Sequence, residues 1–455
     1  PYAPLHHVLM KAVGRPVVAT SGNLSEEPII TDDAAALAKL GKIADAFLRH
    51  DRPIARPCDD SVARCAERRV TLLRRARGYA PMPVRVALEL PATLAVGAHQ
   101  KSTVAIARGR EVFVGQHIGD LDTEEARAAF RSEIDDLCRL YEFRPTVVVR
   151  DLHPDYYSTL HAETLGLPIV AVQHHHAHVA ACAAENGIDE PYLGVAWDGT
   201  GYGSDGTVWG GEFFVCAGRT FERVAHLRPF ALLGGERAIR EGRRVAFGLL
   251  QTIGRSGLPE GLGLSDHEAE TFRTMLDRGL NAPTTTSAGR LFDGVAALAG
   301  VALENRFEGQ AAMALEAVVD RNATRDLYPT DLTEGDRLEL DWRPMIAAVV
   351  RDVERGLGAG VISTRFHNSL AEWVVAVARR MSVCKVVLSG GVFQNGYLVE
   401  RVCERLRDEG HEPYTHQRVP PNDGGIALGQ AVLAGYGEPQ KPARLPAEPA
   451  IADHP

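Results

Sequence analysis

The feature that most constrains the fold of this chain is an order of strands and helices that occurs twice. The first copy is expected to contain strands at 93–99, 102–107 and 111–115, a helix at 124–141, a strand at 146–149, a second helix and a strand at 168–172. The second copy is expected to contain strands at 192–198, 208–216 and 222–227, then helical material, a strand at 385–388, a helix at 395–409, a strand near 412–415 and a helix at 425–434. Buried strands joined by helices are typical of parallel sheets covered by crossover helices. The sequence therefore predicts an α/β fold with two βββαβαβα halves that face each other across a cleft.

Residues 1–85 precede this duplication and resemble half of an α/β domain. A strand is expected at 16–21, a helix at 34–40 begins after Thr31–Asp33, whose oxygens can cap it, and a further strand is expected at 70–73. A core of this size would be marginal alone, and the chain does not start with Met, so we expect a missing N-terminal portion.

The rest of the chain divides around that unit. The predicted divisions are a proline-bearing linker at 86–92, subdomains at 93–190 and 191–438, and a tail at 439–455.

Composition excludes several classes of protein. The 455 residues carry a net charge of -9, so no global basic field is available to attract nucleic acid. No apolar stretch approaches the roughly 20 residues that span a bilayer. The seven cysteines are scattered and include no CxxC pair, which makes a structural zinc site or a disulfide framework a poor interpretation. We expect a cytoplasmic protein with neither nucleic acid nor membrane as a partner.

The densest chemical signal is a group of four histidines within residues 174–178, at the junction of a strand and an Ala-rich helix. His174 and His178 are four positions apart, so both imidazoles lie on one helix face, as two ligands of one metal ion would. A single HxxxH is more often a polar cap or a pair of surface histidines, but four histidines at one junction favour a metal site. His175 and His176 face elsewhere, and we assign them catalytic or supporting roles.

Glycine-rich loops after predicted strands provide candidates for a carboxylate ligand of the metal and for phosphate binding. Asp198 stands in Trp197–Gly203, and Asp423 stands in Asn422–Gly425 before the last helix, where backbone amides can approach an anion. Taken singly, each is more often an ordinary Asp-Gly turn. Ser389–Asn395 is a further candidate phosphate loop. Lys101 is the one cation of the 97–103 turn and is a candidate catalytic residue, which would face a phosphate or a developing anion; a solvated lysine is the alternative interpretation.

No nucleophile stands out, because no G-x-S-x-G elbow is present. This absence favours transfer between two bound substrates with the help of a metal over covalent catalysis.

Taken together, these motifs resemble the C-terminal domain of the HypF carbamoyltransferases. The motifs are Gln173–His178, Trp197–Gly203, Ser389–Asn395 and Asn422–Gly425. That domain is related to the TsaD tRNA-modification proteins and to antibiotic O-carbamoyltransferases, and its duplicated fold is that of actin, Hsp70 and the sugar kinases (ASKHA). Ser21–Asn23 and Arg56–Val62 resemble the latter half of a YrdC-like domain.

The resemblance implies roles for individual residues. It implies a divalent metal, iron or zinc, with magnesium as a candidate companion of the nucleotide. The implied metal ligands are His174, His178, Asp423 and Asp198. The implied nucleotide contacts are Ser21, Asn23, Lys101, Thr103, Asp198, Gly199, Thr200, Gly201, Gly203, Asp293, Gly309, Gln310, Gly390, Gly391 and Asn395.

The resemblance also implies a reaction. HypF enzymes use ATP to convert carbamoyl phosphate into carbamoyl-AMP and pass the carbamoyl group to the C-terminal cysteine of HypE, from which the cyanide ligands of [NiFe]-hydrogenase are made. This sequence contains no acylphosphatase segment, no CxxC zinc fingers and no first half of the YrdC-like domain, so adenylate synthesis by this chain alone stays open.

Three other functions remain as alternatives. Small-molecule O-carbamoyltransferases place the YrdC-like domain after the transfer domain, whereas here it comes before. A metalloprotease is disfavoured because no HExxH is present. A non-catalytic scaffold that binds HypE is the third.

Overall fold

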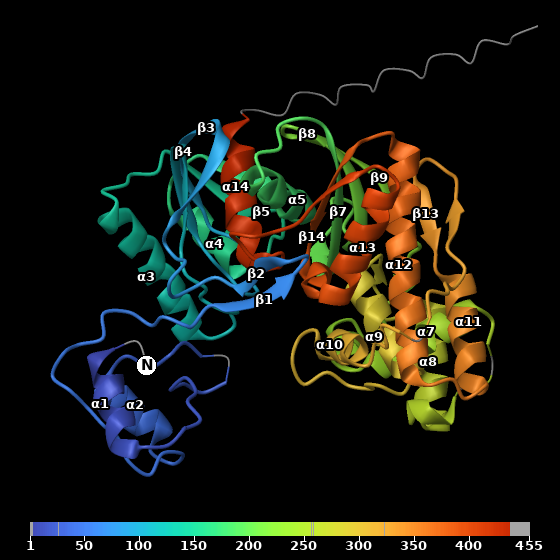
Figure 1. Ribbon diagram of the computed structural model, residues 1–455, viewed down its shortest axis with the longest axis horizontal. Helices are drawn as coiled ribbons and strands as arrows, with labels where there is room; N and C mark the ends of the chain where they lie inside the picture. The colour runs from blue at the N-terminus through green and yellow to red at the C-terminus, as the bar shows by residue number, and fades with distance from the viewer. Residues whose placement is uncertain (1–2, 26, 256, 258, 323, 437–455) are drawn as a thin grey trace, which may run out of the picture.

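The computed structural model describes residues 3–25, 27–255, 257, 259–322 and 324–436, so the predicted tail at 439–455 lies outside the described residues. Two sheets with helices around them form the body of the molecule, and a small lobe with α1 (Pro4–Val13) and α2 (Asp33–Leu40) lies to one side (Figure 1). This architecture confirms the α/β prediction.

The first half of the body is a four-stranded sheet in the order β4-β3-β5-β6. β3 and β4 are antiparallel, whereas β5 pairs in parallel with both β3 and β6. The strands are β3 (Pro83–Ala95), β4 (Ala105–Val114), β5 (Val147–Asp151) and β6 (Ile169–Val172), and the helices are α3 (Glu124–Leu140), α4 (Tyr157–Thr164) and α5 (His174–Glu185).

The second half is built on a nine-stranded sheet whose main path is β12-β13-β9-β8-β7-β14-β15. Its strands are β7 (Tyr192–Tyr202), β8 (Val208–Ala217), β9 (Thr220–Leu227), β10 (Phe230–Ala231), β11 (Thr284–Thr285), β12 (Asp331–Thr333), β13 (Leu338–Asp341), β14 (Lys385–Ser389) and β15 (Glu412–Tyr414). β7 is antiparallel to β8, and β14 pairs in parallel with β7 and β15. The order β8-β7-β14-β15 therefore repeats β4-β3-β5-β6, which confirms the predicted duplication.

Most of the additional length of the second half lies between β9 and β14. The helices of this half are α6 (Glu236–Arg240), α7 (Gly242–Thr252), α8 (Asp266–Arg278), α9 (Ala288–Leu298), α10 (Gln310–Ala317), α11 (Arg343–Glu354), α12 (Ala359–Met381), α13 (Gly396–Asp408) and α14 (Ile426–Gly435), with short 3-10 turns η1 (Glu260–Leu262), η2 (Gly391–Gln394) and η3 (Asp423–Gly425). Trp197, Trp342 and Trp373 are completely buried in the core that these helices share with the sheet.

The last helices of the two halves, α5 and α14, pack directly against each other (Figure 1). Gly429 of α14 faces the backbone of α5, where a Cβ atom would overlap the carbonyl oxygen of Ala177. The alanines of α5 and the glycine of α14 thus allow the two backbones to touch. As a result, the N-terminal ends of both helices, preceded by β6 and by the Asn422–Gly425 turn, lie near one another.

Two expectations for the first half are wrong. The predicted strands at 102–107 and 111–115 belong to one strand, β4, because Gly109 (φ +62°) lies in an irregular part of the ladder and does not reverse the chain. The predicted linker at 86–92 is part of β3, whose alternating burial from Pro83 onward is that of a half-buried strand. Pro91 misled the prediction, although it lies at a register shift, where a strand tolerates proline.

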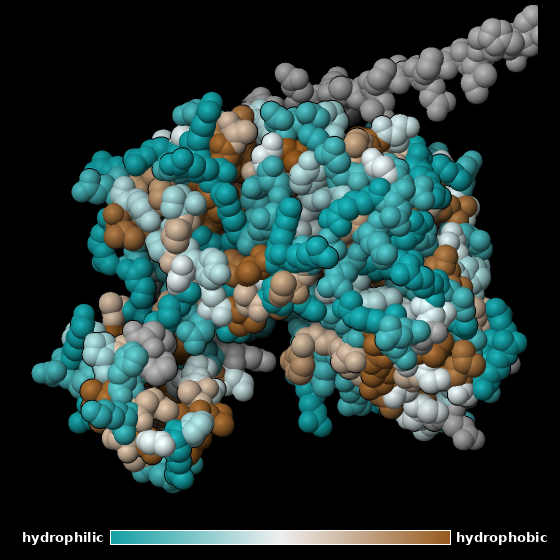
Figure 2. All heavy atoms as spheres, viewed as in Figure 1, coloured by the Kyte–Doolittle hydropathy of each residue, from teal (hydrophilic) through white to brown (hydrophobic). Residues whose placement is uncertain are grey.

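The N-terminal segment is less regular than predicted. The helix α2 is confirmed, and the Asp32 carboxylate accepts a hydrogen bond from Ala35 N, as expected for a cap. The predicted strand at 16–21 is absent from the described structure, and Val18 is fully exposed there. Neither α1 nor α2 has a buried residue. Apolar side chains consequently show on the surface of this lobe (Figure 2).

The hairpin of β1 (Val62–Ala66) and β2 (Arg69–Arg74) belongs instead with the body of the molecule. Arg75, which follows β2, is 3% exposed and donates hydrogen bonds to the carbonyl oxygens of Val114, Tyr79, Met82 and Arg418. Burial lowers the pKa of this guanidinium to about 10. The end of the hairpin is therefore anchored to both halves of the body.

Among the described helices, none is both long enough and apolar enough to cross a bilayer.

The contact between α5 and α14 gives the first testable prediction. Gly429→Ala should lower the free energy of unfolding by about 1–3 kcal/mol, because overpacking a tight interface forces its backbones apart. Gly248→Ala is the matched control: Gly248 is also a buried helical glycine, but the nearest atom to a Cβ added there would be Ala231 O at 3.4 Å. Thermal or denaturant unfolding of both variants measures the difference, and equal stabilities would contradict the close contact.

Candidate metal and nucleotide site

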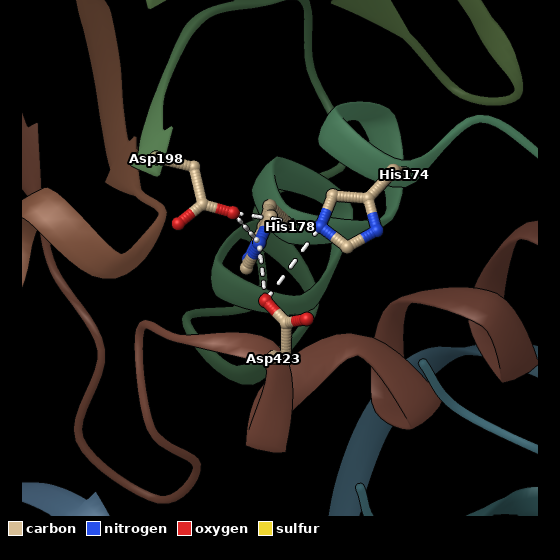
Figure 3. A group of neighbouring side chains, drawn as sticks. All are labelled: His174, His178, Asp198 and Asp423. Atoms are coloured by element: carbon tan, nitrogen blue, oxygen red, sulfur yellow. Dashed lines mark hydrogen bonds and ion pairs between the residues drawn. The ribbon is translucent and has the colours of Figure 1, made fainter. Parts of the chain in front are cut away.

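Four buried side chains converge at the ends of α5 and α14: His174, His178, Asp198 and Asp423 (Figure 3). The histidines are on α5, Asp198 is in β7 where the pairing with β8 shifts register, and Asp423 opens η3, just before α14. One ligand atom of each lies within 4.8 Å of all the others.

The spacing between imidazoles and carboxylates fits a single ion. His178 Nε2 lies 3.3 Å from Asp198 Oδ2 and 3.5 Å from Asp423 Oδ1, and the corresponding distances from His174 Nε2 are 3.5 and 3.6 Å. Two ligand atoms each about 2.1 Å from one ion, at a tetrahedral angle, are about 3.4 Å apart. His174 Nε2 is moreover buried without a hydrogen-bond partner among the described residues. The residues present therefore fit a divalent metal.

The electrostatics of the group also favour a cation. Burial opposes charge on Asp198, but the neighbouring imidazoles of His174 and His178 hold its pKa well below the usual value. Burial likewise opposes charge on Asp423, but the same two histidines lower its pKa to about 2. Two ionised carboxylates side by side in a buried place need positive charge between them.

Surrounding groups fix the orientation of these side chains. Asp151 Oδ2 lies 2.7 Å from His174 Nδ1, so the carboxylate turns Nε2 of the same ring toward the other ligands. Asp198 Oδ1 accepts hydrogen bonds from the backbone amides of Gly199 (2.8 Å) and Gly391 (3.2 Å), which leaves Oδ2 for the site.

Asp151 was missed by the sequence analysis. The signal was its place at the carboxyl end of a parallel strand, β5, beside the strand that leads into the histidines.

The two other histidines of the cluster lie differently. His175 Nδ1 is 3.3 Å from Gln173 Nε2, and burial first, then the neighbouring His174, keeps the pKa of His175 well below its usual value. His176 packs its ring against Phe221, with the centroids 4.4 Å apart. His176 is two positions from each of the histidines of the site, so it points to another side of the helix. Their catalytic roles remain predictions, and this placement makes His176 the weaker candidate.

A cavity of about 520 Å³ opens beside Asp198, between α9, α10 and the turn that contains Gly391. The predicted nucleotide residues that line it are Lys101, Asp198, Gly199, Asp293, Gly309, Gly391 and Asn395. Its wall also contains charged residues that the sequence analysis did not single out: Arg64, Arg290, Glu308, Glu316 and Arg321. Such a cleft, which shares Asp198 with the group of four converging side chains, has the size and polarity of a nucleotide pocket.

Within this cavity some polar atoms lack partners. Asp293 is completely buried, which raises its pKa, while Arg290 and Asn305 counteract that rise. Asn305 Nδ2 is 3.2 Å from Asp293 Oδ1, and Asp293 Oδ2 forms an ion pair with Arg290 Nε at 3.2 Å. Arg290 Nη1 has no hydrogen-bond partner in the described part of the chain. Buried polar groups of this kind mark a place where a ligand can bind. Lys101 Nζ pairs with Glu308 across the opening.

Eight predicted nucleotide residues do not line the cavity: Ser21, Asn23, Thr103, Thr200, Gly201, Gly203, Gly390 and Gln310. Gly201 and Gly203 are close to side chains, so that a Cβ atom would collide with His175 in the first case and with Trp209 in the second. Gly390 has φ +99°, and its Cβ position is blocked by the backbone of Trp197. These glycines permit close packing around the site.

The remaining residues of that set lie in different parts of the chain. Thr103 Oγ1 donates to Gly424 O, beside Asp423, and Gln310 Oε1 accepts from Arg306 N. Thr200 lies in β7. In the N-terminal segment, Asn23 donates to the carbonyl oxygens of Leu24 and Glu27, and Ser21 is exposed. A nucleotide role for these residues remains a prediction.

Comparisons with known proteins find family models that match most of this chain. Residues 194–430 match the family model "Carbamoyltransferase, Kae1-like Domain, second subdomain", residues 89–185 match "HypF Kae1-like domain", and residues 1–76 match the Sua5/YciO/YrdC model described as "Telomere recombination".

Relatives and solved structures of the same kind are similar over most of the chain. Carbamoyltransferase HypF of Synechocystis sp. is 44% identical over 94% of this chain and 58% of its own length. A "Carbamoyltransferase HypF homolog" of Cupriavidus necator is 36% identical over 75% of this chain and 91% of its own length. The crystal structure of full-length HypF in its phosphate- and nucleotide-bound form superposes with a TM-score of 0.90 at 42% identity, over 96% of this chain and 70% of that one.

The chain spans about 58–60% of the length of the first HypF relatives that it matches. The likeness extends across both halves of the body and the segment before it. This chain therefore belongs to the HypF carbamoyltransferase family.

Proposed function

We propose that this chain is an enzyme that transfers a carbamoyl group from carbamoyl-AMP to the C-terminal cysteine of HypE, in the pathway to the cyanide ligands of [NiFe]-hydrogenase. The observation that carries the proposal is the placement of four metal-ligand side chains at single-ion spacing beside a 520 Å³ cleft. Membership of the HypF family supports carbamoyl transfer as the reaction.

ATP and carbamoyl phosphate are the proposed small-molecule substrates of the pathway. The similar full-length HypF structure is a phosphate- and nucleotide-bound form. In this chain Arg290, which pairs through Nε with Asp293 Oδ2, leaves Nη1 without a hydrogen-bond partner among the described residues and offers it to a nucleoside. The Lys101 ammonium is available to a phosphate that displaces Glu308. The ion is proposed to be iron or zinc, with magnesium accompanying the nucleotide.

The mechanism follows from what each group can do. His174, His178, Asp198 and Asp423 would hold the ion, which when bound would act as a Lewis acid toward the carbamoyl carbonyl. Asp151 keeps the His174 ring oriented, and the Gly199 and Gly391 amides keep Asp198 oriented. Lys101 would stabilise the negative charge of the departing AMP. The thiolate of the acceptor would attack the carbonyl carbon, and the bond to the AMP phosphate oxygen would break.

We also propose that synthesis of carbamoyl-AMP needs further residues of a YrdC-like domain. Residues 1–76 match that family, but the helices α1 and α2 of this segment have no buried residue and so form no core of their own. The division into 1–85, 93–190 and 191–438, and a cytoplasmic location, are parts of the same proposal.

The first prediction of this proposal concerns the ion. His174→Ala combined with His178→Ala should abolish both metal binding and carbamoyl transfer without unfolding the chain, because two of four ligands are lost. His411→Ala is the control, since His411 contacts Val383 O outside the site. Elemental analysis and a transfer assay with labelled carbamoyl-AMP and HypE provide the measurements. Full transfer by a metal-free double variant would refute the role of the ion.

A second prediction concerns the nucleotide. Asp293→Ala should weaken ATP binding by about ten-fold or more, as expected when a charged hydrogen-bonding group is lost from a buried site. Asp326→Asn is the control, because Asp326 forms an exposed ion pair with Arg365. Titration calorimetry with ATP measures both affinities, and an unchanged affinity for Asp293→Ala would remove this residue from the proposed site.

A third prediction separates the enzyme from its alternatives. The chain, supplied with labelled carbamoyl-AMP, should label HypE at its terminal cysteine and should not label a HypE that lacks this residue. Binding of HypE without labelling would favour the scaffold, and labelling of a small-molecule hydroxyl instead would favour an O-carbamoyltransferase.

A further inference from the structure

A second buried group of polar side chains lies behind the ion site and consists of Glu185, His416 and Ser389. His416 Nδ1 is 2.6 Å from Glu185 Oε1, and His416 Nε2 is 2.7 Å from Ser389 Oγ. Ser389 is completely buried, His416 is 2% exposed, and the Glu185 side chain is 1% exposed. The three residues come from the end of α5, the end of β14 and the loop after β15.

The directions of these hydrogen bonds can be worked out from the atoms involved. Ser389 Oγ donates its single hydrogen to the carbonyl oxygen of His178 at 2.9 Å. The hydrogen between Ser389 and His416 must therefore come from His416 Nε2. On the other side of the ring, Nδ1 faces the Glu185 carboxylate, whose second oxygen already accepts from the amides of Gln417 and Arg418. A continuous chain of donors thus runs from His416 to the backbone of a proposed metal ligand.

Two other functions of this group are excluded by the same contacts. Cys182, Glu185 and His416 are close enough to hold a metal ion, but both nitrogens of His416 and both oxygens of Glu185 are occupied by hydrogen bonds. Burial also keeps the pKa of the Cys182 thiol well above its usual value, which disfavours a thiolate ligand. The arrangement resembles a Ser-His-Glu triad, yet Ser389 has no exposed surface and cannot reach a substrate.

The position of Ser389 explains what the chain of hydrogen bonds can control. Three consecutive residues, Ser389 to Gly391, contact all three segments that carry the proposed ligands. Ser389 Oγ binds the carbonyl of His178, Gly390 N donates to Pro421 O two residues before Asp423, and Gly391 N donates to Asp198 Oδ1. A displacement of Ser389 would therefore also displace His178, Asp198 and the loop of Asp423.

We propose that Glu185, His416 and Ser389 are positioning residues that hold the ligand-bearing segments at the spacing required for one ion. This inference rests on the proposed ion site. Groups that orient metal ligands typically change metal affinity by about 10- to 100-fold when they are removed. The effect expected here is of that size and acts on binding of the ion itself, before any carbamoyl transfer.

The test is a zinc titration of the full chain, in competition with a chromophoric chelator, on the parent and its variants. Ser389→Ala and His416→Gln should each weaken zinc binding by about 10- to 100-fold while circular dichroism and Tm show a folded protein. The double variant should lose no more than Ser389→Ala alone, because both residues act through one chain of bonds. Ser369→Ala is the matched control, because Ser369 is equally buried and forms hydrogen bonds with backbone groups of Arg365 and Tyr328. The Ser369→Ala variant should bind zinc with the affinity of the parent.

Each outcome decides between the two proposals. If the parent binds zinc and the folded Ser389→Ala and His416→Gln variants bind it equally well, this inference is overturned while the ion site stands. Losses that add in the double variant would also overturn it. If the parent binds no zinc or ferrous iron, both proposals fail. If Ser389→Ala does not fold, His416→Gln provides the same test because it retains the serine hydroxyl.

A conservative variant supplies a further check. Glu185→Gln can keep its amide oxygen on the Gln417 and Arg418 amides, while its nitrogen donates to His416 Nδ1 and His416 Nε2 still donates to Ser389. Zinc affinity should therefore be retained. A loss in this folded variant as large as in Ser389→Ala would overturn the role assigned to the hydrogen-bond chain.

Discussion

The site depends on one contact, the direct approach of α5 to α14. Ala177 and Gly429 lack the side chains that would separate the two backbones, so the ends of two helices from different halves come together. The proposed ligands then divide between the halves: His174 and His178 come from the first, and Asp198 and Asp423 from the second. An ion at this place would act as a cross-link at the centre of the duplicated fold, and ion binding would stabilise the association of the halves by mass action.

The close approach of these four side chains also determines the electrostatics of the site. One ligand atom from each of two carboxylates and two imidazoles lies within 4.8 Å of the others, and all four side chains are buried. Away from water, like charges repel each other strongly. Asp151 adds a third carboxylate on the outer side of His174. The positive charge of an ion would balance this group, and the glycines around it serve mainly to let backbone and rings approach closely. The cleft, by contrast, contains Arg64, Arg290 and Arg321 together with acidic residues, so positive charge for an anionic ligand is already present in its wall.

How much of this the sequence predicts depends on the range of the interaction. The pair His174 and His178 follows from helical spacing alone, because both residues belong to one helix. Asp198 and Asp423 lie far away in sequence, and their meeting with the histidines depends on the packing of two halves. The residues alone therefore made them candidates, and the family resemblance was needed to assign them as ligands. Asp151 was missed because nothing local distinguishes a carboxylate at a strand end. The linker at 86–92 was wrong because proline outweighed the alternation of β3, which only its pairing with β4 reveals.

The β1–β2 hairpin has a consequence for how such proteins divide into modules. Arg64 of β1 bonds to Gln394 O at 2.8 Å and to Glu316 Oε1 at 3.0 Å, and its guanidinium fills the space beside Gly396. This segment matches a different family model from the two halves of the body, and yet it supplies one wall of the cavity between α9, α10 and the Gly391 turn. The border between the two family models therefore does not coincide with the border of the cavity. A gene fusion or truncation made at that family border would remove one wall of the cavity.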